Sequence, residues 1–229
     1  TNNIYIKYGL QYINGLDEIP YDPTLIIVGR CFGLRLDKKL HEWGKNKGIE
    51  VVSIIDHWSW YLDGYMMDGK VNLPDHILVN DDLAYDDCIN EGIPADRLLV
   101  VGNPVLEELI LTEKKNYVDR SKLRRNYSFP EKRLIVFISE DLRDDSHIVK
   151  HINAIDEYFV LDEIIKLILP SDHLIIKMHP SEKIDKYDSY LSKSVTVVDT
   201  MDVHNLNQVA DVVIGMGSIL LLELAMLRK

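Results

Sequence analysis

The chain has 229 residues, of which 46% are hydrophobic and 28% charged, and its formal net charge is -11. This length allows one large domain or two small ones with a sizeable core. The negative charge argues against generic binding to nucleic acid or to an anionic lipid surface. It leaves room for a small phosphorylated ligand, because backbone N–H groups at a helix N-terminus can bind one without a basic surface.

Targeting and membrane signals are absent from the sequence. No apolar run approaches the ~20 residues of a membrane span, and no signal peptide is visible. The chain starts at Thr1 rather than Met, so we expect the natural N-terminus to lie outside it. Cys31 and Cys88 do not have metal-ligand spacing, which favours two reduced thiols. We therefore expect a cytoplasmic protein without a transmembrane segment, one that could also associate peripherally with a membrane.

Short β-branched runs alternate with helical stretches over the first 104 residues. Strands are predicted at 25–28, 50–55, 77–79 and 98–101, and helices at 36–47 and 84–90. This alternation is typical of a parallel sheet with helices on its faces. A charged segment with helical periodicity follows at 105–126 and predicts an interdomain helix and linker, the alternative being one more surface helix of a single domain.

A second series with the same rhythm fills the rest of the chain. Strands are predicted at 134–138, 174–177, 195–198 and 212–214, and helices at 152–169, 187–193, 203–210 and 219–227. The predicted fold class is therefore α/β, with two Rossmann-like lobes that contain parallel sheets. The predicted boundaries are 1–104 for the first lobe, 105–130 for a linker helix and 131–229 for the second lobe. Because the chain stops one helix after the last strand, we expect it to be incomplete at one or both ends.

In open parallel sheets, ligands bind beyond the carboxyl ends of the strands. At one such end Gly217 and Ser218 lie between an apolar strand and an apolar helix, and Glu223 follows in that helix. Small residues there would let a phosphate reach the free N–H groups of the helix start, and Glu223 could reach ribose hydroxyls. The alternative is a tight turn in which Ser218 merely caps the helix.

A second candidate follows the strand predicted at 174–177. His179 stands at that strand end and Pro180 follows it, so the imidazole could donate to a phosphate or to a base carbonyl. A single histidine is more often structural. Its position and the neighbouring Lys177 favour a ligand contact here.

The order of these motifs resembles that of the GT-B superfamily. A strand ending in His-Pro, followed some 40 residues later by a Gly/Ser turn and a helix glutamate, is similar to the C-terminal domain of these proteins. UDP-N-acetylglucosamine 2-epimerase-like proteins, CDP-glycerol glycerophosphotransferases and bacterial CMP-sugar transferases with a His-Pro motif belong to this group. Residues 74–79, 91–94 and 100–104 resemble the end of its N-terminal domain. The chain departs from the pattern in its short first half, in the lack of a glycine-rich first loop and in its early end.

The resemblance implies a nucleotide site in the second half. It assigns His179 and Pro180 to phosphate or base, Gly217 and Ser218 to phosphate and Glu223 to ribose, with Ser139 in the same cleft. It also implies that helix dipoles and side chains stabilise the leaving diphosphate, so no cofactor and no essential metal are expected. The acidic pairs Asp81–Asp82, Asp86–Asp87 and Asp144–Asp145 are interpreted as solvated faces.

The first half would supply the acceptor side. Asp56 and His57 follow a predicted strand and could form a general-base pair in which the carboxylate orients the imidazole. Trp58 and Trp60 could stack on a sugar. The alternative is a packed aromatic loop that contains a satisfied histidine.

These observations predict a glycosyltransferase-like enzyme. It would transfer a sugar or phospho-sugar from a UDP-, CDP- or CMP-linked donor to a glycan or other sugar acceptor, in polysaccharide biosynthesis. One alternative is a nucleotide-sugar 2-epimerase or hydrolase on the same fold. Another is a non-catalytic nucleotide-sugar-binding module, which the short first half favours. The base, the sugar and the acceptor stay open.

Overall fold

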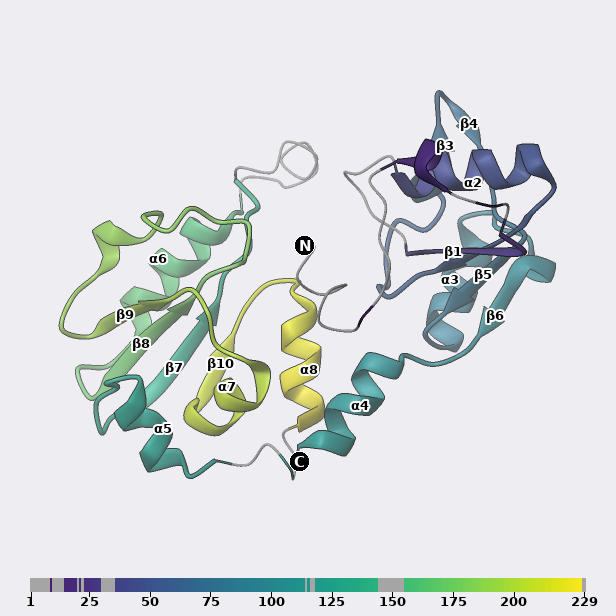
Figure 1. The fold of residues 1–229 in the computed structure, drawn as a ribbon. Coiled ribbons are helices and arrows are strands. Elements are labelled where there is room, and N and C mark those ends of the chain that lie inside the picture. Colours follow the sequence, from purple (N-terminus) through teal and green to yellow (C-terminus); the bar gives the residue numbers. More distant parts are fainter. Residues whose placement is uncertain are drawn as a thin grey trace. The chain divides into compact units, whose positions relative to one another are not determined.

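A computed structural model describes residues 9, 15–19, 21, 23–29, 36–113, 115, 118–143 and 155–227 of the chain. The chain divides into two compact units, Thr1–Pro104 and Val105–Lys229. Each unit contains a four-stranded sheet whose strands all pair in parallel. The predicted fold class, α/β with two Rossmann-like lobes, is confirmed (Figure 1).

The first unit is built on the strand order β1-β2-β5-β6. Its strands are β1 (Leu25–Gly29), β2 (Glu50–Ile54), β5 (His76–Val79) and β6 (Leu98–Val100). Its helices are α2 (Leu36–Lys47) and α3 (Asp82–Asn90), with 3-10 turns η1 (Leu16–Glu18), η2 (Asp63–Tyr65) and η3 (Ala95–Arg97). A small antiparallel hairpin, β3 (Met66–Met67) and β4 (Lys70–Val71), lies in the connection between β2 and β5.

Helix α3 shows how local sequence sets an element's bounds. The Asp81 carboxylate accepts a hydrogen bond from the Ala84 backbone N–H and caps the N-terminus. Gly92 ends the helix at a φ of 96°, a left-handed conformation that favours glycine. Cys88 on this helix is buried and forms no disulfide with a described residue, while Cys31 lies outside the described residues.

One face of the first sheet is buried and the other is exposed. The buried residues of β1 and β2 alternate with exposed ones, and their strand register places Ile26 and Val51 on the same face. On the other face Ile27 is 60% exposed and Leu99 is 49% exposed. The strand predicted at 25–28 does form, but only one of its faces is buried, because no described element covers the other.

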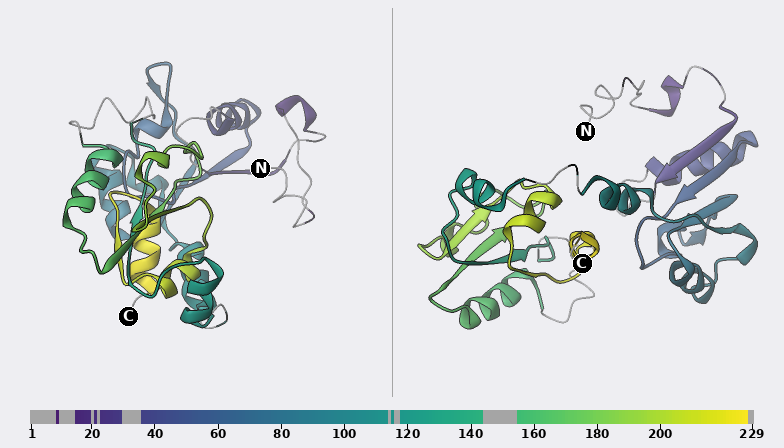
Figure 2. Two further views of the ribbon diagram at one scale, coloured as in Figure 1. Left: turned by 90° about the vertical axis from the view of Figure 1, so that its left-hand side faces the viewer. Right: turned by 90° about the horizontal axis from the view of Figure 1, so that it is seen from below.

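The second unit has the strand order β10-β7-β8-β9. Its strands are β7 (Arg133–Ile138), β8 (Asp172–Lys177), β9 (Val195–Val198) and β10 (Val212–Ile214). Its helices are α4 (Pro104–Thr112, which begins at the unit boundary), α5 (Arg120–Asn126), α6 (Glu157–Leu167), α7 (Val203–Val209) and α8 (Ile219–Leu227). Helix α6 covers one face of the sheet, while α5, α7 and α8 cover the other (Figures 1 and 2). The central strands β7 and β8 are therefore buried almost throughout.

Residues 105–126, expected as one helix, form two. Asp119 accepts a hydrogen bond from the Lys122 backbone N–H and so begins α5 as a separate helix. Arg124 of α5 is buried and donates to the Asp211 carboxylate at 2.9 Å and to the Val209 carbonyl at 3.1 Å. Helix α5 is therefore fastened to the second unit.

Two other predicted helices differ from the observed elements. Asp156 caps α6, so that helix begins later than 152, although residues 151–154 lie outside the described residues. The helix expected at 187–193 is wrong. Only the 3-10 turn η4 (Asp188–Tyr190) forms, because Leu191 is extended and Ser192 pairs with Val195 in a bridge that leads into β9. Among the described residues, no helix has both the length and the apolar character that crossing a bilayer requires.

Candidate functional site

A carboxylate that follows β7, one of the two central strands of the second sheet, lies at the start of α8. Glu140 follows β7, and its Oε1 accepts hydrogen bonds from the backbone N–H of Gly217 at 2.6 Å and of Ser218 at 2.9 Å. These two N–H groups form the predicted anion site of the turn between β10 and α8. The turn therefore already binds an anion, and that anion is a side chain of the protein itself.

Ser218 also caps α8, as the alternative interpretation of this turn held. Its Oγ lies 3.3 Å from the Leu220 backbone N–H. Gly217 is exposed, and a Cβ added there would meet the Glu140 Oε2 at 3.6 Å, so the carboxylate lies against the glycine. Glu223, further along α8, is half-buried, and burial raises the pKa of its carboxyl group.

His179 and Pro180 are exposed at the end of β8. The His179 backbone N–H donates to the Glu182 Oε2 at 2.7 Å, and its Nδ1 lies 2.7 Å from the Ser181 Oγ. The Ser181 Oγ in turn donates to the Asp141 Oδ2 at 3.2 Å. The histidine is therefore fixed through both its main chain and its ring.

A buried ion cluster lies behind this loop. The Lys186 ammonium donates to Glu157 at 2.5 Å and to Asp141 at 3.1 Å, and it lies 2.9 Å from Glu182. The side chains of Glu157 and Glu182 are 0% exposed, and that of Lys186 is 3% exposed. Burial alone would lower the pKa of the ammonium, but the hydrogen bonds to the three carboxylates outweigh it, so the pKa is raised.

The same three carboxylates are the group of described residues that could hold a metal ion, since one oxygen from each lies within 4.8 Å of the others. In this structure the Lys186 ammonium binds all three. The cluster is therefore complete as an ion pair network. The predicted acidic pair Asp144–Asp145 lies outside the described residues.

Ser139 connects β7 to this network. It is buried, donates to the Glu182 Oε1 at 2.6 Å and shares a hydrogen bond with the Tyr187 hydroxyl. Its hydroxyl group therefore supports the loop that carries His179. Ser139 faces the His179 side of β7, while the next residue, Glu140, faces the α8 side.

The strand order explains why these groups share one sheet edge. Strand β7 lies between β10 and β8, and all three run in parallel, so the residues after them emerge together. With neighbouring strands about 4.8 Å apart, the ends of β8 and β10 lie roughly 10 Å apart. His179 and Ser218 thus flank the end of β7 at the same edge of one sheet.

In the first unit, Asp56 and His57 follow β2 as expected. The Asp56 Oδ1 lies 3.3 Å from the His57 Nδ1, and the aspartate side chain is 79% exposed. The His57 ring stacks on Tyr61 with centroids 6.3 Å apart. The Trp58 indole N–H donates to Asp81, the cap of α3, at 2.8 Å.

The two tryptophans of this loop differ. Trp58 is half-buried and packs against the core that contains Ile77 and Cys88. Trp60 is 42% exposed and has a φ of 54°. Of the two predicted stacking residues, the one with an accessible ring is therefore Trp60.

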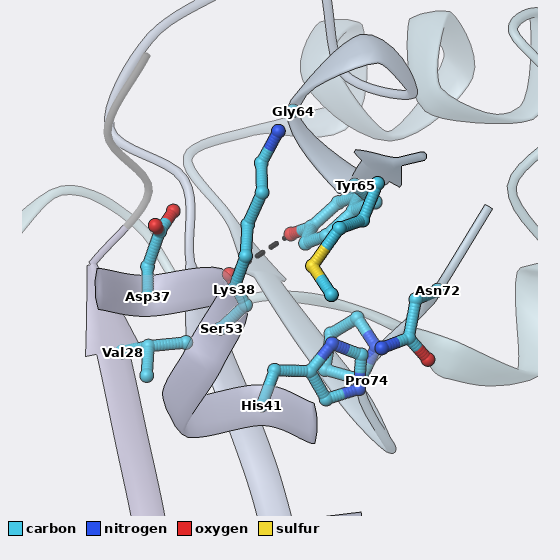
Figure 3. Close-up of a pocket in the computed structure, with 10 residues that line it drawn as sticks. Val28, Asp37, Lys38, His41, Ser53, Gly64, Tyr65, Asn72 and Pro74 are labelled. Carbon is cyan, nitrogen blue, oxygen red and sulfur yellow. Dashed lines mark hydrogen bonds between the residues drawn. The ribbon is translucent and has the colours of Figure 1, made fainter. Parts of the chain in front are cut away.

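A pocket elsewhere in the first unit was not predicted from the sequence. It is a small pocket between α2, β1–β2 and the segment 64–74. His41, Asn72 and Pro74 lie together along it, and the Tyr65 hydroxyl donates to Ser53 at 2.9 Å (Figure 3). Burial, followed by the nearby Lys45 charge, lowers the pKa of His41, which favours the neutral imidazole.

The sequence motifs gave no role to Glu140, Glu182 or Lys186. Glu182 and Lys186 follow the His-Pro dipeptide after one serine, four residues apart. That spacing indicates contact only within a helix, and the structure forms turns here. No local signal indicated that Glu157 or Glu140 would complete the arrangement.

Comparison with known proteins gave structural matches only. No family model and no curated protein sequence matches the chain. Two structures of UDP-GlcNAc 2-epimerase from Methanocaldococcus jannaschii, one of them in complex with UDP-GlcNAc and UDP, match 98% of this chain at 15% identity, with TM-scores of 0.51 and 0.60. The wall teichoic acid polymerase TagF matches 90% of the chain at 11% identity with a TM-score of 0.42.

The chain spans 61% and 60% of the length of the two epimerase chains. At this identity the matches establish the fold, which is GT-B-like, as the sequence motifs indicated. They leave the reaction open.

Proposed function

We propose that the chain binds a nucleotide-activated sugar donor at the carboxyl edge of the second sheet. It would transfer the sugar or phospho-sugar of this donor to a glycan or other sugar acceptor. The observation that carries this proposal is the anion-binding turn at Gly217 and Ser218 beside His179. Two backbone N–H groups and the positive end of the α8 dipole are suited to a phosphate. In the donor complex, the phosphate takes the position that Glu140 occupies.

Departure of the nucleotide develops negative charge on a phosphate oxygen, and preorganised donors stabilise that charge. Gly217, Ser218 and His179 would supply those donors, and Pro180 would restrain the loop. Glu223 would contact the ribose from α8. Ser139 would act indirectly, because its hydrogen bond to Glu182 supports the loop that carries His179.

The acceptor hydroxyl needs a base near the reacting carbon. Asp56 and His57 remain our proposal for that base, because the carboxylate lies within reach of the imidazole and both follow a strand end of the first sheet. Exposed Trp60 would offer a surface on which a sugar can stack.

The first experiment is calorimetry with UDP, CDP, CMP and GDP, together with Ser218→Leu and His179→Ala. We expect one nucleotide to bind the parent protein. A leucine at 218 should abolish binding by filling the phosphate position, while loss of the imidazole should weaken it by ~1.5–3 kcal/mol. The circular dichroism of both variants should match the parent. Binding of all four nucleotides unchanged in both variants would contradict the site.

A second candidate is epimerisation or hydrolysis of a nucleotide sugar. The match to two 2-epimerase structures favours it as the alternative. A product assay with the donor alone separates the two. Conversion of the donor without an acceptor supports the epimerase or hydrolase, whereas product that appears only with an acceptor supports transfer. Nucleotide binding without any turnover would indicate a non-catalytic binding module.

A further inference from the structure

Among the described residues, the ring of His179 is held at its Nδ1 side. Its Nδ1 lies 2.7 Å from the Ser181 Oγ, and that oxygen lies 3.2 Å from the Asp141 Oδ2. The three groups form a hydrogen-bonded series that starts at an exposed imidazole and ends at a half-buried carboxylate. The other ring nitrogen, Nε2, is not part of this series.

The number of available protons selects one arrangement of hydrogen bonds in this series. The Ser181 hydroxyl has a single proton, and the Asp141 carboxylate can only accept. If that proton goes to Asp141, the short contact between Nδ1 and Oγ must be made by a proton on Nδ1. Both contacts are then hydrogen bonds, and Nε2 is left with a lone pair in the neutral ring.

The opposite arrangement satisfies fewer contacts. If the Ser181 hydroxyl donates to Nδ1, its contact with Asp141 holds no proton and two oxygens with lone pairs face each other. The Ser181 backbone N–H lies 3.3 Å from Nδ1 and favours this arrangement. Because Ser181 is exposed, that N–H can donate to water instead when Nδ1 carries the proton.

Asp141 is itself fixed as an acceptor. The Lys186 ammonium binds it and is also bound by Glu157 and Glu182, of which the latter accepts from the His179 main chain. Since the Lys186 side chain is 3% exposed, the buried cluster holds the Asp141 carboxylate in a fixed position. Among the described residues, Glu182 contacts His179 directly and Asp141 contacts it through Ser181, while Lys186 and Glu157 lie behind these two carboxylates.

We propose that Ser181 and Asp141 are positioning residues that keep a proton on His179 Nδ1, so that the ligand meets Nε2. A neutral ring with its proton on Nδ1 offers only a lone pair at Nε2. His179 therefore donates to a phosphate oxygen only as the imidazolium. The second half of this inference rests on the proposed function, because it takes the ligand to be a nucleotide diphosphate. The tautomer itself does not.

The tautomer can be measured directly by NMR of the full chain labelled with ¹⁵N-histidine. At a pH well above ~6.5, where an unperturbed imidazole is neutral, we expect the His179 signal to show a protonated Nδ1. Ser181→Ala and Asp141→Asn should move the proton to Nε2. His179→Gln assigns the signal, and Ser189→Ala, which removes another exposed hydroxyl, should leave it unchanged. A proton on Nε2 in the parent protein, or an unchanged signal in both variants, overturns the proposal.

Calorimetry with UDP-GlcNAc at about pH 6 and pH 8.5 tests the consequence. Each phosphate of this probe carries one ester and one anhydride bond, so neither has a second ionisation. Binding to the parent protein should weaken at the higher pH, because a neutral ring with its proton on Nδ1 offers no donor at Nε2. Ser181→Ala and Asp141→Asn, with the proton on Nε2, keep that donor in the neutral ring and should lose most of this dependence, whereas a purely structural role would weaken binding equally at both.

The two hypotheses fail in different ways. If the NMR result is as expected but UDP-GlcNAc and the nucleotide panel do not bind, the tautomer assignment stands and the proposed function fails. If nucleotides bind but His179 carries its proton on Nε2, the positioning role fails and the proposed function stands.

Discussion

The two sheets are both four-stranded and parallel but differ in how they are covered. Strand β8 of the second sheet is buried at every position, whereas β1 of the first sheet alternates between buried and exposed residues. Strand β1 reads LIIVG and the middle of β8 reads LII, and such apolar runs are typical of sheets covered on two faces. The comparison shows that an apolar run indicates which residues can be buried. The helices that pack on the sheet determine which of them are buried.

The residues that follow the strands are also held differently in the two units. In the second unit, the residues that follow β7 and β8 are joined by buried ion pairs and by hydrogen bonds to the backbone. In the first unit, the Asp56 and His57 side chains lie 3.3 Å apart, and the aspartate side chain is 79% exposed. The polar groups at these strand ends are therefore more deeply buried in the second unit than in the first, and four changes test this contrast.

Replacing Lys186 with methionine should have the largest effect. It leaves Asp141, Glu157 and Glu182 without their shared cation, and breaking a buried pair in this way costs about 3–5 kcal/mol. Urea denaturation would measure the loss. The exposed neighbour Lys183→Met is the matched control and should stay within ±0.5 kcal/mol of the parent. Equal stabilities of the two variants would show that the cluster is not a structural unit.

A matched pair of isoleucines tests the difference in covering. Ile176→Ala removes a side chain that is 0% exposed and should cost about 2–5 kcal/mol. Ile27→Ala removes one that is 60% exposed and should cost less than about 1 kcal/mol, the span of strand propensity. A loss at position 27 as large as at position 176 would show that the outer face of the first sheet is covered in solution.

Glu140→Ala should strengthen nucleotide binding on the order of tenfold, or ~1.4 kcal/mol. The carboxylate occupies the Gly217 and Ser218 N–H groups that the phosphate needs, so removing it removes a competitor. Calorimetry against the parent protein measures the change, and Glu131→Ala, an exposed glutamate before β7, is the control. Weaker binding in Glu140→Ala would instead make this carboxylate a ligand contact.

Glu223→Gln should give the smallest effect, and that effect should depend on pH. Burial raises the pKa of Glu223 above 4.5, so the native state binds its proton more tightly than the unfolded chain does. Its contribution to stability is full below pH 4.5 and is lost as the pH rises through the raised value. The variant, which cannot ionise, should therefore be more stable than the parent near neutral pH and should lose that advantage below pH 4.5. Denaturation at both pH values measures this, and an advantage that does not vary with pH would contradict it.

Local pattern was sufficient for most secondary structure elements. Apolar runs located the strands, and the polar or glycine residues after them located the candidate ligand positions, including Gly217 and His179. Caps were less visible, because Asp119 and Asp156 begin helices inside stretches whose periodicity favours one continuous helix. The extended backbone at Leu191 likewise overrides the helical pattern around it.

The sequence by itself determined the alternation of strands and helices, and with it the sheet edge at which His179 and Ser218 lie. That information is local, since it depends on periods of two and 3.6 residues. Only the tertiary structure decided that Lys186 meets Glu157, 29 positions away, and that Glu140 meets Gly217, 77 positions away. Such pairings depend on which strands become neighbours and on which charges the packing buries. A carboxylate that looks like any other in the sequence can therefore occupy the anion site in the fold.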